Sequence, residues 1–372
     1  MAAERSPLLD RFLRLCIIEA PSGREAPMAE ALRAELAAMG LEARGDGTAA
    51  RTGGACDNLA VELLPAGEAR RWVTLMAHMD AVPPGRAVDP YVHEGAVRTR
   101  GAILSADDRA GIAILLELLA AVRREPLCRL GLQALFTASE ETGLGGAEVL
   151  DRSALRGEFG VVLDTGGPPG QVNTASPTAL RFAVRFRGRS AHAGVEPEKG
   201  ANALLMAARL VAALPSGRLD LDTTFSCTRA SAGTATNIVP DDALVEGEVR
   251  SFREGEAGRL LALLKEEAES AARSLGGTVA VTVEALFPPY HVAEDHPAVA
   301  ALLAAAEAEG WRGFAHRSGG GSDANHLNAA GLPAVNVGVG YRNPHSPEEI
   351  LILDEFEGAY RWLLRFLRSL DG

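Results

Sequence analysis

The sequence lacks any excess of positive charge, because 37 lysine and arginine residues stand against 49 aspartate and glutamate residues, for a formal net charge of −12. A nucleic-acid binder needs a basic surface, so this balance excludes nucleic acid as a partner. No apolar run is long enough to span a bilayer, which excludes a membrane-spanning helix, and we expect no membrane partner. The N-terminal stretch has scattered charges and no uninterrupted apolar core, so we predict no signal peptide and a cytoplasmic location.

Cysteine is also scarce. Cys16, Cys56, Cys128 and Cys227 are isolated and match no zinc or redox spacing. We expect reduced, buried thiols, as is usual in the cytosol. Repeats and low-complexity segments are absent, while 47% hydrophobic and 23% charged residues are ordinary for a globular protein. A chain of 372 residues exceeds what one compact core usually takes, so we expect two domains.

The chain does contain short apolar runs that end in polar residues, a pattern typical of buried parallel strands. His78 and Asp80 close the run that begins at Val73, and residues two apart in a strand point to the same face. Two interpretations of this pair stay open. The histidine is either hydrogen-bonded to Asp80 in the core, or it is a metal ligand whose second ring nitrogen donates to that carboxylate.

Acidic residues end or follow the other apolar segments. Asp107 and Asp108 stand at the start of an apolar helix, where capping explains one aspartate but leaves a second carboxylate over. Glu140 and Glu141 follow an apolar strand, and adjacent like charges repel unless a cation lies nearby. Asp164 ends a third strand of the same kind.

The pattern changes after residue 177. Alternating strands and two helices follow in the order β-α-β-β-α-β, which is ferredoxin-like, and the alternation indicates a sheet with one open face. We therefore predict that a domain at residues 177–287 is inserted into an α/β domain made of residues 1–176 and 288–372. The segment 83–100, rich in proline and glycine, is expected to be a loop.

The residues that are hard to explain by structure alone all lie at carboxyl ends of apolar strands or in the loops beyond, where open α/β sheets build their sites. They are His78, Asp80, Asp107, Glu140, Glu141, Asp164 and His345. Two imidazoles and several carboxylates form a ligand set for zinc or a similar divalent metal. So many carboxylates would repel one another without about two cations, and one carboxylate can bridge two metals in a hydrolytic site.

These motifs resemble those of the M20 family of metallopeptidases and amidohydrolases, most closely its peptidase T-like tripeptidase branch. The matching stretches run in order from residue 75 to beyond 345: LMAHMDAV, SADDRAGIAILLELL, FTASEETGLGGA, VVLDTGG, GRSAHAGVEPEKGANAL, TNIVPDDALVEGEVRS, GGGSDAN and NPHSPEE. The resemblance implies a three-layer α/β catalytic domain of the zinc-peptidase (phosphorylase/hydrolase-like) kind. It also implies an inserted ferredoxin-like α+β domain that serves in dimerisation and as a lid.

The same resemblance implies two divalent metal ions per chain, zinc in the first place, with cobalt and manganese as alternatives. It assigns the ligands in three groups: His78 and Asp164 on one ion, Glu141 and His345 on the other, and Asp107 bridging both. Asp108 would be the less constrained neighbour. A cis peptide bond often follows the bridging aspartate in such proteins.

Catalytic roles follow from the resemblance as well. Asp80 would orient His78, and Glu140 would be the general base that takes a proton from a metal-bridging water and passes it to the leaving amine. His192 would stabilise the oxyanion across the interface of a homodimer. The alternative for His192 is a turn histidine in a glycine-rich loop.

Four further residues are candidates for substrate binding. Asn237 is expected to be a donor near the oxyanion or a substrate carboxylate. Arg250 is either a bidentate partner of a substrate carboxylate or a structural arginine on its strand. Gly320 and Ser322 belong to a glycine-rich loop that resembles one receiving the substrate backbone through its N–H groups.

The sequence thus predicts a cytoplasmic, dimeric, dinuclear-metal hydrolase that cleaves a peptide bond of short peptides, as a tripeptidase or aminopeptidase does. An alternative with the same metal chemistry is an amidohydrolase or deacylase of N-acyl or N-carbamoyl amino acids. A third alternative is a binding or regulatory protein on an inactive scaffold. It requires the loss of a ligand or of the base, whereas every expected position is filled here.

Overall fold

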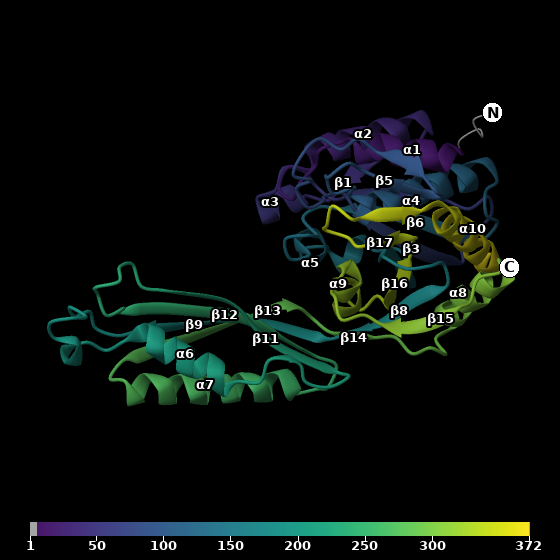
Figure 1. Cartoon of the computed structure of the whole chain (residues 1–372). Helices are drawn as coiled ribbons and strands as arrows, with labels where there is room; N and C mark the ends of the chain where they lie inside the picture. The colour runs from purple at the N-terminus through teal and green to yellow at the C-terminus, as the bar shows by residue number, and fades with distance from the viewer. Residues whose placement is uncertain (1–5, 372) are drawn as a thin grey trace. The chain divides into compact units, whose positions relative to one another are not determined.

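The computed structural model describes residues 6–371 and divides into two compact units (Figure 1). Unit 2 is Pro177–Pro289, and unit 1 is formed by the parts of the chain on either side of it. Each unit has its own hydrophobic core. Unit 2 is therefore an insertion, because the chain leaves unit 1 and later returns to complete it.

A nine-stranded mixed sheet forms the centre of unit 1. Four neighbouring strands run parallel: β6 (Leu130–Thr137), β3 (Arg71–His78), β7 (Phe159–Thr165) and β16 (Ala334–Gly338). Their carboxyl ends consequently meet at one edge of the sheet. The remaining strands are β1 (Arg44–Gly45), β2 (Leu59–Leu63), β8 (Gln171–Ser176), β14 (Tyr290–His291) and β15 (Phe314–Arg317).

The helices of unit 1 bury apolar faces, and the central strands are buried along their length. All eight residues of β6 and the last six of β3 are buried, which explains why these strands are continuous apolar runs. Helix α4 packs on β3 and β7. The helices are α1 (Pro7–Cys16), α2 (Ala26–Ala38), α3 (Thr48–Thr52), α4 (Ala106–Arg124), α5 (Gly145–Glu148), α8 (Pro297–Ala308), α9 (Asp323–Ala329) and α10 (Leu353–Leu370).

A small antiparallel sheet lies within unit 1 and corrects one prediction. Its order is β17 (Tyr341–Arg342), β18 (Ile350–Ile352), β5 (Ala96–Arg98) and β4 (Tyr91–His93). The segment 83–100 is thus not all loop, because β4 and β5 form a hairpin inside it. Glu94 and Gly95, the two residues of the turn between them, both have positive φ angles, which allow a two-residue connection. Three-residue strands are too short for alternation to reveal them in a sequence.

Unit 2 has the predicted β-α-β-β-α-β order, with the two-residue β10 (Gly217–Arg218) in addition. Its antiparallel sheet runs β10-β11-β12-β9-β13. Figure 1 shows α6 (Ala203–Ala213) and α7 (Glu256–Ser274) along the same face of this sheet. With one face covered, β12 is buried at every second residue. The long strands are β9 (Thr178–Arg187), β11 (Thr223–Ala232), β12 (Asp242–Ser251) and β13 (Thr278–Phe287).

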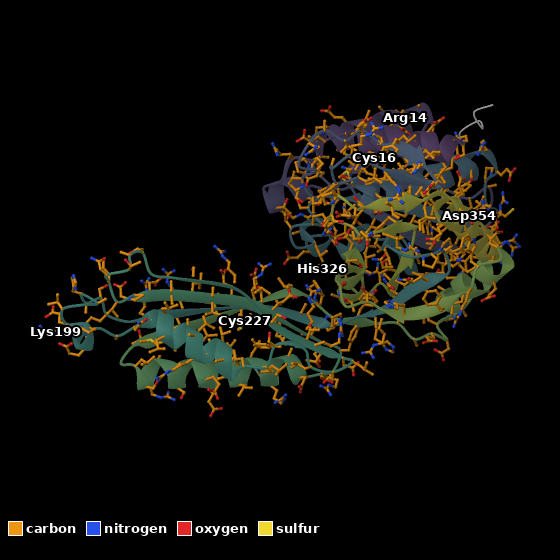
Figure 2. The ribbon with its side chains drawn as sticks, in the orientation of Figure 1. Arg14, Cys16, Lys199, Cys227, His326 and Asp354 are labelled. Carbon is orange, nitrogen blue, oxygen red and sulfur yellow. The ribbon has the colours of Figure 1, made fainter. Side chains whose placement is uncertain are left out.

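The cysteines are free, as expected, but they are not all buried. Cys16 is buried, Cys56 and Cys227 are half-buried, and Cys128 is exposed (Figure 2 labels Cys16 and Cys227). The prediction of buried thiols is therefore correct for Cys16 and wrong for Cys128. Among residues 6–371, none of the helices combines the length and apolar character that crossing a membrane would need.

Candidate metal centre and active site

Asp107 lies between two histidines that come from distant parts of the chain. Its Oδ1 is 3.0 Å from Nε2 of His78, and its Oδ2 is 3.2 Å from Nε2 of His345. The same nitrogen of His345 lies 3.0 Å from Oε1 of Glu141, and that of His78 lies 3.7 Å from Oδ1 of Asp164. Asp107 therefore presents one carboxylate oxygen to each of two pairs of side chains, as a carboxylate that bridges two metals must.

Parallel strands deliver these side chains to one place. His78 is the last residue of β3, Asp164 lies at the end of β7, and Glu141 follows β6. Asp107 is in the first turn of α4. His345 comes from the loop between β17 and β18, where its φ of 62° lies in the left-handed region. The carboxyl edge of the sheet thus gathers five residues that the sequence analysis selected.

The start of α4 is irregular. The Asp107–Asp108 peptide bond is cis, and both residues have non-helical backbone angles. Asp108 is fully buried: its Oδ2 accepts a hydrogen bond from the backbone N–H of His78 at 3.2 Å, and its Oδ1 accepts one from Gly111 at 3.0 Å. The expectation that Asp108 is the less constrained neighbour is therefore wrong.

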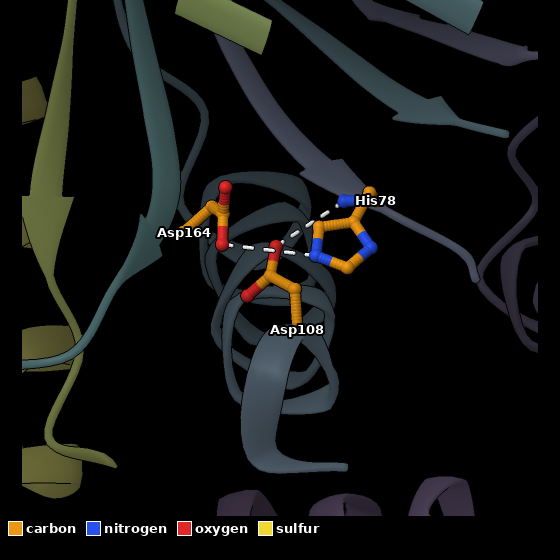
Figure 3. Close-up of side chains that lie close together, drawn as sticks. All are labelled: His78, Asp108 and Asp164. Atoms are coloured by element: carbon orange, nitrogen blue, oxygen red, sulfur yellow. Dashed lines mark hydrogen bonds and ion pairs between the residues drawn. The ribbon is translucent and has the colours of Figure 1, made fainter. Parts of the chain in front are cut away.

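Asp108 also lies close enough to His78 and Asp164 to be considered a metal ligand (Figure 3). In a second group, His78 with Asp107 and Glu141, the candidate ligand atoms likewise lie within 4.8 Å of one another. Both oxygens of Asp108 already accept backbone N–H groups, whereas those of Asp107 face imidazole nitrogens. The geometry consequently favours Asp107 as the ligand and Asp108 as its structural neighbour.

Asp80 connects the ends of β3 and β6. Its Oδ1 lies 3.4 Å from Nδ1 of His78 and accepts the N–H of Glu140 at 2.9 Å. Its Oδ2 accepts the N–H of Glu141 at 3.0 Å and the Ser22 hydroxyl at 2.6 Å. Nδ1 of His78 makes no well-formed hydrogen bond within residues 6–371, so the contact with Asp80 is electrostatic. One carboxylate thus faces a candidate ligand and also fixes the two glutamates. The sequence offered no signal for the second task.

The charges of the cluster show that it suits cations. Burial, with repulsion from Asp107, raises the pKa of Asp164 to about 8, and burial with repulsion from Asp164 raises that of Glu140 well above its usual value. Burial opposes the charged form of His78, yet hydrogen bonds with Asp107 and Asp164 still raise its pKa well above the ordinary value. Burial is the largest cause at Asp164 and Glu140, and the negative charge of neighbouring carboxylates adds to it. Divalent cations would compensate that charge, so the residues fit a metal centre.

Glu140 differs from its neighbours in one respect. Its backbone N–H is fixed by Asp80, but no hydrogen bond or ion pair engages its carboxylate in the described part of the chain. Glu141, next to it, is engaged with His345. An unengaged carboxylate beside a metal centre is available to move a proton.

The candidates His192, Asn237 and Arg250 lie in unit 2. His192 is exposed, and its Nδ1 accepts the N–H of Gly194 at 3.2 Å. The carbonyl of Asn237 accepts the N–H of Ala193 at 2.9 Å, so the segments that carry the first two candidates are side by side. Arg250 donates two hydrogen bonds to Glu248. Its guanidinium carbon also lies 5.6 Å from the centre of the Phe287 ring. These contacts favour the structural alternative for Arg250.

The glycine-rich loop before α9 uses its amide groups internally. The N–H of Gly320 donates to the Ser318 hydroxyl at 3.1 Å, and the N–H of Ser322 donates to Oδ1 of Asn325 at 2.9 Å. Ser322 is buried and is the N-cap of α9. A substrate could receive these two N–H groups only after they exchange their present partners.

The chain is similar to known proteins over most of its length. The model of peptidase family M20/M25/M40 matches residues 74–369. An uncharacterised protein of Bacillus subtilis strain 168, YqjE, is 34% identical over 349 residues, which cover 94% of each chain. The crystal structure of aminopeptidase PepT from Bacillus cereus ATCC 10987 has a TM-score of 0.90 and is 32% identical, with 98% of each chain covered. That of a tripeptidase from Staphylococcus aureus Mu50 has a TM-score of 0.93 and 30% identity, again over 98% of each chain.

Proposed function

The chain belongs to peptidase family M20/M25/M40, and we propose that this peptidase cleaves a peptide bond of short peptides, tripeptides among them, at a dinuclear metal centre. The observation that carries the proposal is Asp107, whose two oxygens face two separate ligand pairs. The substrate class rests on the aminopeptidase and the tripeptidase whose folds this chain shares at 32% and 30% identity. The α/β fold with an inserted α+β unit, expected from the sequence, is confirmed by the same likeness.

The ligand assignment follows the contacts. His78 and Asp164 would hold one ion, Glu141 and His345 the other, and Asp107 would contact both. When bound, two divalent ions polarise the scissile carbonyl and make water a nucleophile at neutral pH. Zinc is the first choice for this mixed set of nitrogen and oxygen ligands, and cobalt and manganese also accept it.

Glu140 would move the proton. Its free carboxylate would accept a proton from the attacking water and then donate it to the nitrogen of the leaving amine. Asp80 would assist by fixing the backbone of Glu140 through the 2.9 Å hydrogen bond.

Oxyanion stabilisation is assigned to unit 2. The exposed imidazole of His192 would donate to the developing oxyanion from the partner subunit of a homodimer, with Asn237 from the neighbouring segment as a second donor. Short peptides and acylated amino acids are both compatible with such a site. The cytoplasmic location stays a prediction from the sequence.

A substrate screen tests the peptidase assignment. Purified, metal-loaded protein is offered dipeptides, tripeptides, and N-acetyl and N-carbamoyl amino acids, and release of free amino acid is measured. We expect the highest kcat/KM on a peptide with a free amino terminus. A preference for an acylated amino acid would replace the peptidase by a deacylase, and no turnover of any compound would favour the inactive scaffold.

Metal content tests the dinuclear centre separately. Mass spectrometry of the metal-loaded protein after removal of loosely bound ions should find about two divalent ions per chain. Asp107→Asn should hold fewer, because the amide offers only one oxygen in place of the two that face the histidines. A wild-type protein that binds no metal after supplementation would refute the centre.

A further inference from the structure

Glu349 is a buried carboxylate beside the candidate metal centre, and its position in the sequence indicated no role for it. Its residue is 1% exposed, and it lies four positions after His345. The following strand, β18, pairs with neighbours on both sides, through Leu351 to Tyr341 and to Val97. The backbone N–H of Glu349 donates to the carbonyl of Ser346 at 3.0 Å. The position of this side chain is therefore well fixed.

Both oxygens of Glu349 accept hydrogen bonds from the backbone that leads into α4. Oε2 accepts the N–H of Ser105 at 2.7 Å, and Oε1 accepts the N–H of Asp107 at 3.1 Å. The first N–H groups of a helix have no partner within the helix. The start of α4 depends more than usual on an acceptor outside the helix, because Ser105 has a left-handed φ of 60° and Asp107 has non-helical backbone angles. One planar carboxylate thus accepts hydrogen bonds from two amide groups that lie two residues apart.

We infer that Glu349 is a positioning residue that fixes the backbone of Asp107, so that each oxygen of Asp107 faces its own pair of candidate ligands. The inference rests on the proposed dinuclear centre. A carboxylate at this position is energetically unfavourable, because it is buried near other acids and pairs with no lysine or arginine in residues 6–371. A neutral acceptor would cap one N–H at a lower cost. Only a carboxylate offers two acceptor oxygens on one rigid group.

The location of Glu349 links the two halves of the centre. The same short segment carries His345, whose Nε2 lies 3.2 Å from Oδ2 of Asp107. The segment therefore supplies one candidate ligand directly and fixes the backbone of the bridging one. A shift of Glu349 would displace Asp107 relative to both His78 and His345. Loss of such supporting contacts typically lowers metal affinity about 10- to 100-fold.

Metal titration tests this role. Glu349→Gln keeps the size of the side chain but replaces one acceptor oxygen by a donor that faces an N–H group. We expect at least one of the two binding steps for Zn²⁺, measured by competition with a chromophoric chelator, to weaken about 10- to 100-fold. The visible absorption bands of the Co²⁺-loaded variant should also change. Glu348→Gln is the matched control, because it removes the same charge from an adjacent, exposed residue.

A second variant separates position from charge. Glu349→Asp keeps the carboxylate but shortens the side chain by one methylene, which withdraws it from the two N–H groups. It should also weaken metal binding, and it remains informative if Glu349→Gln does not fold. Unchanged affinities in a folded Glu349 variant, with two ions bound by the wild type, would overturn the positioning role alone. A wild type that binds fewer than two ions would overturn the dinuclear centre and this inference with it.

Discussion

At the scale of single residues, Glu140 and Glu141 are neighbours that face different surroundings. Their N–H groups donate to the two oxygens of Asp80, one to each. The Glu141 carboxylate lies 3.0 Å from His345, whereas that of Glu140 has no such partner within the described chain. The contacts thus separate a ligand from a base. From the sequence, the two roles could be assigned only through the family resemblance, because two adjacent glutamates are chemically identical.

Substitution of each glutamate should have a different effect. Glu140→Gln should lower kcat about 10²- to 10⁴-fold and keep both metal ions, because it removes only the proton acceptor. Glu141→Gln is the matched variant and should lose metal, since it removes a candidate ligand oxygen. Kinetics on a tripeptide and metal analysis of both variants make the comparison. Normal turnover by Glu140→Gln would exclude Glu140 as the base.

His345 should make the stability of the metal-free protein depend on pH. Ion pairs with Asp107 and Glu141 raise its pKa from 6.5 to about 10, so the folded state binds this proton more tightly than the unfolded state. The stabilisation is complete below pH 6.5 and is lost as the pH rises towards 10. We expect the Tm of chelator-treated protein to fall over this range. The Tm of the His345→Gln variant should fall less steeply with pH. Equal slopes of Tm against pH in the two proteins would contradict a contribution from these ion pairs.

At the scale of elements, the end of α10 is joined to the start of β6 by Asp371. Its Oδ2 accepts the N–H of Cys128 at 2.7 Å, and its Oδ1 accepts those of Arg129 and Leu130 at 2.7 and 2.9 Å. Burial opposes its charge, but the three hydrogen bonds together outweigh burial and lower its pKa. A single side chain thus satisfies three backbone donors that precede or begin a central strand.

Asp371→Asn should lower the free energy of unfolding by about 1–2 kcal/mol, because hydrogen bonds to a charged acceptor are lost near the surface. Catalysis should not change, since Asp371 is not part of the metal centre. Asp354→Asn is the control: it removes the same charge at the other end of α10, from an exposed side chain (Figure 2). Its effect should stay below about 1 kcal/mol, the usual contribution of a charge at a helix terminus. If urea unfolding gave equal losses of unfolding free energy for the two variants, the effect would come from the charge and not from the three hydrogen bonds.

Long elements were predictable from the sequence and short ones were not. Strands β3, β6 and β7 and the 19-residue helix α7 carry an apolar pattern over enough residues to define them. Strand β8 reads Gln-Val-Asn-Thr-Ala-Ser, and its polar composition gave no signal although most of it is buried. The three-residue strands β4 and β5 and the seven-residue α9 are too short for periodicity to act. Their formation depends on partners that are distant in sequence.

The candidate site shows the same limit. Its acids and histidines could be found because a charged side chain at the end of an apolar strand is visible in the sequence. The hydrogen bonds that Asp80 and Glu349 accept could not be found in the sequence, because their donors are backbone N–H groups, which every residue except proline carries. The burial of Asp108 was missed for this reason too. Sequence thus identified the charged residues of the site, Asp80 included, but not the backbone hydrogen bonds by which Asp80 and Glu349 fix their neighbours in position.

At the scale of the whole molecule, the proposed machinery is divided between two units. The candidate ligands and Glu140 belong to unit 1, and His192 belongs to unit 2. The two units have separate cores, so a substitution on the surface of one should leave the other folded. His192→Ala should therefore lower kcat and keep both metal ions. If His192 serves the active site of the partner subunit, activity should return when the variant forms a dimer with a subunit whose own His192 is intact.

Mixed dimers test that arrangement. In a hybrid of His192→Ala with Glu140→Gln, one active site combines an intact Glu140 with an intact His192 from the other subunit. Random exchange of equal amounts gives hybrids in half of the dimers, so about a quarter of wild-type activity should return. Glu140→Gln mixed with Glu141→Gln is the control, because both lesions fall in unit 1 and every site stays defective. Subunit exchange is verified by co-purification of differently tagged chains. With exchange verified, no recovery in the first mixture would show that His192 acts within its own chain or not at all.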